Sequence, residues 1–122
     1  MLKQDYLLRM IEQFNLAIET SIEKEKLQKF EYAQDTLEDT LAHALDMSSQ
    51  TLLALSPESF LTIVKLSQIN EEVAIYISFI LFRLSNILQA QDPKLAQLRE
   101  AQGRAVAKEY GFEFGLSPQI ES

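Results

Sequence analysis

The sequence predicts an all-α fold: a single-domain bundle of about five to six helices around a central buried helix near residues 71–90. Three observations predict it. Only three of the 122 residues are glycine, and Pro57 and Pro93 stand where helical segments begin. Apolar residues recur at steps of three and four, and no sustained alternation indicates a strand. The segment from Val73 to Leu88 is almost continuously apolar, so other parts of a protein must bury it.

The first segment is a predicted helix of about twenty residues. Its apolar face consists of side chains at helical spacing: Leu7, Met10, Ile11, Phe14, Ala17, Ile18, Ser21 and Ile22. Across residues 23–29 this face loses its phase, because Leu27 and Phe30 would turn about 140° to 200° away from it in a continuous helix. We expect a break or kink here, either between two separate helices or within one bent helix.

The middle of the chain contains a second amphipathic segment and two shorter helices. The second segment covers about residues 30–46 and carries acidic side chains on its outer face. A short helix is expected around residues 51–54. Ser56 before Pro57 is a start signal, because a serine oxygen can accept from a first-turn N–H and proline needs no donor there. The helix that begins there should run to about Ser67.

Two further start signals define the last two helices. Asn70, followed by two glutamates, combines a side-chain cap with carboxylates near the positive end of the helix dipole. It begins the apolar central helix. Asp92 before Pro93 repeats the cap-and-proline pattern, and Gly111 suits a left-handed C-terminal residue. Gly103, inside the last helix, is a predicted weak point.

The faces of the central helix are expected to have different neighbours. A broad apolar arc requires two neighbouring helices: Tyr76, Ile87, Ile80, Val73, Leu84, Ile77, Leu88 and Leu81. A strip of small residues predicts the close approach of another helix: Ala74, Ser78 and Ser85, flanked by Ile75 and Phe82. A third arc is expected to face water: Glu72, Phe79, Arg83 and Asn86. If the chain's own helices cannot cover the apolar faces, a second subunit must.

The chain is expected to form one domain over residues 1–122 and to end in a non-helical tail over 111–122. Phe112, Phe114 and Leu116 alternate with other residues in this tail. They can pack back into a groove of the bundle or serve as a short docking peptide for a neighbouring chain. Packing is the favoured interpretation.

Near the N-terminus, Asp5, Tyr6 and Arg9 allow two interpretations. Asp5 favours the start of a helix through the dipole, and Asp5 and Arg9 are spaced for a weak surface pair. Alternatively, Tyr6 and Arg9 form a patch that faces a partner, since both residue types are enriched at binding hot spots.

The opening QDYLLRMIEQF, the segment SPESFLTIV and the two closing helices resemble a family of short all-helical proteins from Gram-positive bacteria, known as a domain of unknown function. The resemblance covers most of residues 2–110, and its most specific part is the motif QDYxxRxIEQ at residues 4–13. It implies kinship and a helical interaction fold, but no substrate. Relatives often end in helical pairs similar to tetratricopeptide repeats. The pair 73–90 and 93–109 has that length, although Gln89 and Gln102 stand where an aromatic residue is expected.

Composition excludes several classes of function. The net charge is −7, and residues 1–46 carry five basic against ten acidic groups, so a basic stripe for nucleic acid is absent. A helix over 73–88 would rise only about 24 Å, too short for a membrane span, and Arg83 interrupts it. The sequence has no cysteine and its charged start lacks an apolar leader, which favours a cytoplasmic location.

Candidate chemistry is sparse. His43, the single histidine, lies one helical turn from Asp39, which makes the acidic second segment a candidate for metal or acid–base chemistry. However, His43 has Thr40 where a di-iron bundle has glutamate, and no phosphate loop, calcium loop or nucleophile motif is present. We expect no enzyme activity, no cofactor and no metal site.

The leading functional hypothesis is a non-enzymatic helical module for protein–protein interaction that self-associates as a homodimer or binds an unidentified protein partner. The predicted interaction surface comprises Tyr6, Arg9, Ile75, Phe79, Phe82, Phe112 and Phe114. A first alternative is a helical bundle that binds a small apolar ligand or lipid. A second is a metal-dependent enzyme that uses the acidic second helix and His43.

Overall fold

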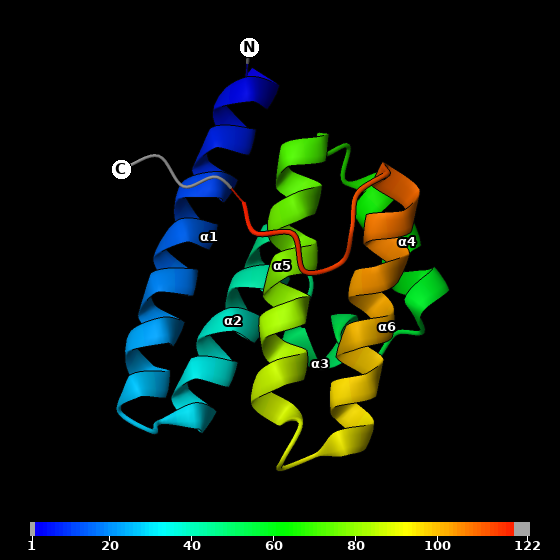
Figure 1. The fold of residues 1–122 in the computed structure, drawn as a ribbon. Coiled ribbons are helices and arrows are strands. Elements are labelled where there is room, and N and C mark those ends of the chain that lie inside the picture. The colour runs from blue at the N-terminus through cyan, green and yellow to red at the C-terminus, as the bar shows by residue number, and fades with distance from the viewer. Residues whose placement is uncertain (1, 119–122) are drawn as a thin grey trace.

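The computed structural model describes residues 2–118 and confirms the predicted all-α fold (Figure 1). Within these residues the chain forms six helices: α1 (Leu2–Lys26), α2 (Phe30–Ala44), α3 (Ser49–Leu52), α4 (Pro57–Leu66), α5 (Glu71–Leu88) and α6 (Pro93–Tyr110). The helices share one hydrophobic core, in which α5 is the central element. None of the described helices is both long enough and apolar enough to cross a lipid bilayer.

The predicted start signals of three helices are confirmed by side-chain caps, and a fourth helix, α3, begins with a cap that was not predicted. Asn70 Oδ1 accepts from the Val73 N–H at 2.9 Å at the start of α5. Equivalent caps begin α3, α4 and α6: Ser48, Ser56 and Asp92, each accepting at 3.2 Å from the N–H three residues later. Because the cap of α3 is Ser48, that helix begins at Ser49, two residues earlier than expected, and the predicted range of 51–54 is corrected accordingly.

The predicted break after the first segment is confirmed, and it separates two helices. α1 is longer than expected, with 25 residues, and ends at Lys26. Gln28 adopts a φ of 60°, a left-handed conformation that cannot continue a helix. The Lys29 N–H then bonds the Lys24 carbonyl at 2.8 Å, which closes a tight turn. The chain therefore reverses, and α1 and α2 form an antiparallel hairpin (Figure 1).

The neighbours that the central helix requires come from the chain itself. In Figure 1, α5 lies between the α1–α2 hairpin on one side and α6 on the other, and it contacts all three helices. The small-residue strip is confirmed as the close contact with α6, because Ser78 is buried and its Oγ donates to the Gly103 carbonyl at 3.0 Å. Gly103 is thus required by packing: a Cβ at this position would overlap the Phe114 ring and lie 3.1 Å from the Leu81 Cβ.

One expectation about α5 is wrong. Arg83 was expected to face water, but only 16% of its side chain is exposed. It forms an ion pair with Glu25 of α1, and its Nε donates to the Ser21 Oγ at 3.3 Å. Phe79, assigned to the same arc, is also partly buried against the core. α1, which runs to Lys26, covers this side of α5 with Ser21 and Glu25.

The C-terminal tail packs back onto the bundle, as the favoured interpretation predicted. After α6 ends at Tyr110, with Gly111 as a C-cap of left-handed φ 80°, the chain crosses α5 (Figure 1). The rings of Phe82 and Phe114 meet edge to face with centroids 5.4 Å apart, and the Arg104 guanidinium lies 4.9 Å from the Phe114 centroid. Phe112 packs against the core. The last four positions of the predicted tail, 119–122, lie outside the described residues.

Candidate functional site

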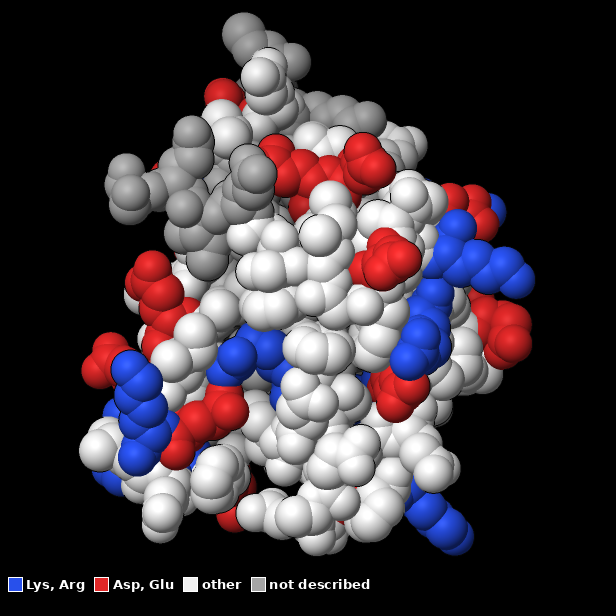
Figure 2. Space-filling view, in the orientation of Figure 1, with Lys and Arg blue, Asp and Glu red and all other residues white. Residues whose placement is uncertain are grey.

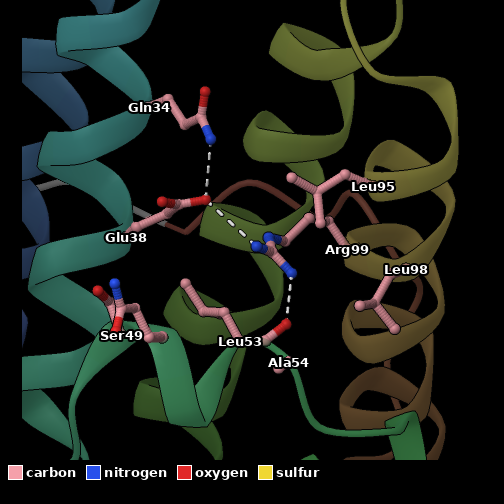
Figure 3. A pocket seen from close by; sticks show the side chains of 9 residues that line it. Gln34, Glu38, Ser49, Leu53, Ala54, Leu95, Leu98 and Arg99 are labelled. Atoms are coloured by element: carbon pink, nitrogen blue, oxygen red, sulfur yellow. Dashed lines mark hydrogen bonds and ion pairs between the residues drawn. The ribbon is translucent and has the colours of Figure 1, made fainter.

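A hollow of about 410 Å³ lies between α2, α3 and α6, and an ion pair of Glu38 and Arg99 forms part of its lining (Figure 3). Arg99 Nη2 is 3.3 Å from Glu38 Oε2, and their side chains are only 5% and 16% exposed. The Arg99 Nη1 donates to the Leu53 carbonyl at 2.7 Å, and the Gln34 Nε2 donates to the same Glu38 oxygen at 3.1 Å. One guanidinium therefore connects α6 to α2 and to the end of α3.

Gln102 extends this network into the core. It is fully buried, and its Nε2 donates to the carbonyls of Leu53 at 3.2 Å and Leu55 at 2.9 Å. These bonds satisfy backbone groups in the connection between α3 and α4, which would otherwise be costly to bury. The position where a repeat hairpin would carry an aromatic residue thus holds a polar side chain that fixes a loop.

The electrostatics of the network indicate a structural role. Burial lowers the pKa of Arg99 because it penalises the charged guanidinium, and the nearby Glu38 carboxylate opposes that effect. The Arg99 Nε is buried without a hydrogen-bond partner, so the guanidinium is not fully compensated. The two terminal nitrogens of Arg99 and the Glu38 Oε2 already bond within the chain, which supports a structural role for this pair.

Sequence reasoning missed this network. Glu38 was assigned to the solvated outer face of the second segment, whereas it is partly buried against Arg99. A signal was available: Arg99 and Gln102 stand three residues apart and share the helical spacing of Ala96 and Val106, which both face the core. Two polar residues on a buried stripe of a helix predict that both side chains find hydrogen-bond partners inside the protein.

A second concave surface is a groove of about 370 Å³ between α1 and α2, hereafter the hairpin groove. Its lining combines small, hydroxyl and apolar side chains: Gln13, Leu16, Ala17, Thr20, Tyr32, Thr36, Asp39, Thr40 and His43. Leu16 is 65% exposed and Tyr32 is 55% exposed, although both are large apolar side chains. The hairpin groove therefore offers apolar surface to water from both of its helices.

Tyr6 and Arg9, the predicted partner-facing residues, extend the hairpin groove along α1. Tyr6 and Gln13 are seven residues apart, as are Arg9 and Leu16, and residues seven apart lie on nearly the same face of a helix. The Tyr6 hydroxyl donates to the Ala44 carbonyl at the end of α2 at 3.2 Å while 48% of the residue stays exposed. Both residues therefore lie at the end of the groove that is away from the turn between α1 and α2, hereafter its open end.

His43 and Asp39, the candidates for acid–base or metal chemistry, both line the hairpin groove. Within residues 2–118, however, no three side chains of histidine, cysteine, aspartate or glutamate come together in a way that could hold a metal ion. The metal-dependent alternative therefore has no ligand set in this part of the chain.

The other predicted interaction residues form a separate surface on α5 and the tail. Figure 2 shows this face: uncharged side chains occupy much of its middle, next to a patch of basic side-chain atoms, and most other charged side chains lie toward its edges. Ile75, Phe79, Phe82 and Phe114 are each partly buried here, and Phe79 stacks on Phe82 with centroids 6.0 Å apart. Because the chain's own tail covers α5, this face no longer requires a second subunit.

Comparison with known proteins finds no match to this chain, whether among family models, curated proteins or solved structures.

Proposed function

We propose that this chain is a non-enzymatic helical module that binds a protein partner through the hairpin groove. The observation that carries the proposal is the exposure of Leu16 and Tyr32, more than half in each case, on the two sides of one groove. Full burial of a side chain of this size contributes about 1.5–3 kcal/mol, so covering both would supply a useful part of a binding energy. Tyrosine is also enriched among hot-spot residues.

The arrangement of the core supports this choice of surface. The inner face of the α1–α2 hairpin is filled by α5, and the apolar surface of α5 is covered by α1, α2, α6 and the tail. On the outer side of the hairpin, by contrast, Leu16 and Tyr32 remain exposed to water. Two antiparallel helices with an open groove between them can bind a third helix, as in helix-in-groove recognition.

The test is a pull-down from the native host with the wild-type chain and two matched variants. Leu16→Glu places a charge in the hairpin groove, and Leu66→Glu places the same charge on α4, where the leucine is 73% exposed. We expect Leu16→Glu to lose a bound protein that the wild type and Leu66→Glu both retain. Equal recovery of every bound protein by both variants would contradict the proposal.

Self-association would be an alternative use of the same groove. The sequence argument for a dimer rested on α5, and that argument is weakened because the chain covers α5 itself. If a dimer forms, the hairpin groove is the surface that a second copy would cover. Light scattering of the wild type and of Leu16→Glu would then show a dimer and a monomer respectively.

A further inference from the structure

From the charges around the hairpin groove we infer that its partner is a basic amphipathic helix. The inference rests on the proposed function and names the chemistry of the partner. The groove has an apolar strip, formed by Leu16, Ala17 and, toward the turn between the helices, Tyr32, and the methyl groups of its threonines widen that surface. Such a strip matches the apolar stripe of a helix whose anchors recur at i, i+3, i+4 and i+7.

Carboxylates flank this apolar strip on both helices. On α1, Glu12 and Glu19 stand one turn before and after Leu16, and Glu23 follows one turn later. On α2, Asp35 and Asp39 lie one and two turns after Tyr32.

All five carboxylates are exposed, and within the described part of the chain none forms an ion pair. They are therefore free to meet cationic groups from outside.

The basic side chains of this region stand near the two ends of the groove. Arg9 lies at its open end, one turn before Gln13. Lys24 lies toward the turn between the helices, with its Nζ 4.5 Å from the centroid of the Tyr32 ring. The negative charge is therefore greatest along the middle, so the lysines and arginines of the partner should flank the central turns of its apolar stripe.

The charge pattern argues against two other occupants. A second copy of the chain would bring a surface of the same acidic kind, because the net charge of −7 is concentrated in the hairpin, and like charges across an interface are unfavourable. An acidic or neutral helix could use the apolar strip but would leave the carboxylates without partners. A basic helix satisfies both features of the groove.

The experiment uses the full chain and synthetic peptides of roughly 18 residues, about five helical turns. One peptide has a leucine stripe flanked by lysines, the second has glutamate in place of every lysine, and the third has the lysines of the first but its leucines scattered. Binding is measured by fluorescence anisotropy at low and at physiological salt. We expect only the first peptide to bind, and its affinity to fall as salt is raised.

Two matched sets of substitutions locate the binding. The groove set replaces three of the flanking carboxylates: Glu12→Gln, Glu19→Gln and Asp39→Asn. The control set replaces three exposed carboxylates elsewhere: Glu58→Gln, Glu71→Gln and Glu113→Gln. The two sets remove the same charge, and we expect the groove set to lower the affinity about tenfold while the control set changes it less than twofold.

The possible failures are distinguishable. If the glutamate peptide binds as well as the lysine peptide, or if the control set weakens binding as much as the groove set, the basic-helix inference is overturned while the interaction module still stands. A dimer that Leu16→Glu dissociates would likewise assign the groove to a second copy. If no peptide binds and Leu16→Glu changes nothing in the host pull-down, both the inference and the proposed function fail.

Discussion

Removing Glu38 from the Glu38–Arg99 pair should cost more stability than removing Arg99. Glu38→Ala removes the carboxylate and leaves a guanidinium whose side chain is only 5% exposed. The stranded charge keeps the Leu53 carbonyl but loses its counter-ion, and its Nε already lacks a partner. Removing one member of a buried pair in this way costs about 3–5 kcal/mol.

Arg99→Met should cost much less. The remaining Glu38 side chain is 16% exposed, lies beside the open hollow and still accepts from Gln34 Nε2 at 3.1 Å. The Leu53 carbonyl also keeps a donor, because Gln102 Nε2 is 3.2 Å away. What is lost is one charged side chain with its three hydrogen bonds, among them the 3.4 Å bond to the buried Gln102 Oε1, in a site that methionine can partly fill, which corresponds to about 1–3 kcal/mol.

Urea unfolding of both variants, followed by circular dichroism, measures the two costs. The double variant Glu38→Ala/Arg99→Met should be more stable than Glu38→Ala alone, because it removes the stranded charge. If Glu38→Ala costs no more than Arg99→Met, or if the two costs simply add in the double variant, the interpretation of Arg99 as a buried charge that depends on Glu38 is wrong.

Three further predictions concern other parts of the molecule. Gly103→Ala should expel the Phe114 ring from α6, because the new Cβ would overlap it, so chymotrypsin should cleave the tail faster; unchanged protection would contradict this close contact. Leu16→Glu should change the free energy of unfolding by less than about 0.5 kcal/mol, because an exposed position supports little of the fold; a larger loss would show that Leu16 is structural. Burial raises the pKa of Tyr76 and of Tyr110 above 10.0, and the folded state therefore holds protons there that the unfolded state releases. The contribution of these two tyrosines to stability should be constant below this pH and be lost as the pH rises above it, and Tyr76→Phe should flatten the decline in alkaline urea titrations.

The local signals in the sequence were sufficient for the existence of the helices and for most of their boundaries, although α1 is longer and α3 begins earlier than predicted. Asn70 and Asp92 cap α5 and α6 where the sequence placed the starts of these helices, and Gly111 ends α6 in the left-handed conformation. Such features act over three or four residues, so the sequence alone displays them. The break before Phe30 was visible for the same reason, as a loss of helical phase.

Contacts between distant segments were harder to predict. Arg83 was assigned to water because it shares one arc of its helix with Glu72 and Asn86, whereas its partner Glu25 lies 58 residues earlier in the chain. Arg99 and Glu38 are separated by 61 residues, and a charged residue is ordinarily expected on the surface. The hairpin groove could not be predicted either, because it exists only when α1 and α2 lie side by side. Tyr6 and Arg9, at its open end, were nevertheless predicted as interaction residues from their residue types.

The measurement that tests the central claim most directly is a map of backbone amide chemical shifts when the lysine–leucine peptide is added to the labelled chain. If the hairpin groove is the binding surface, the largest changes cluster on its lining, around Gln13, Thr20, Thr36 and His43. Changes that instead cluster on the α5–tail face, around Phe79 and Phe82, would contradict the assignment of function to the groove.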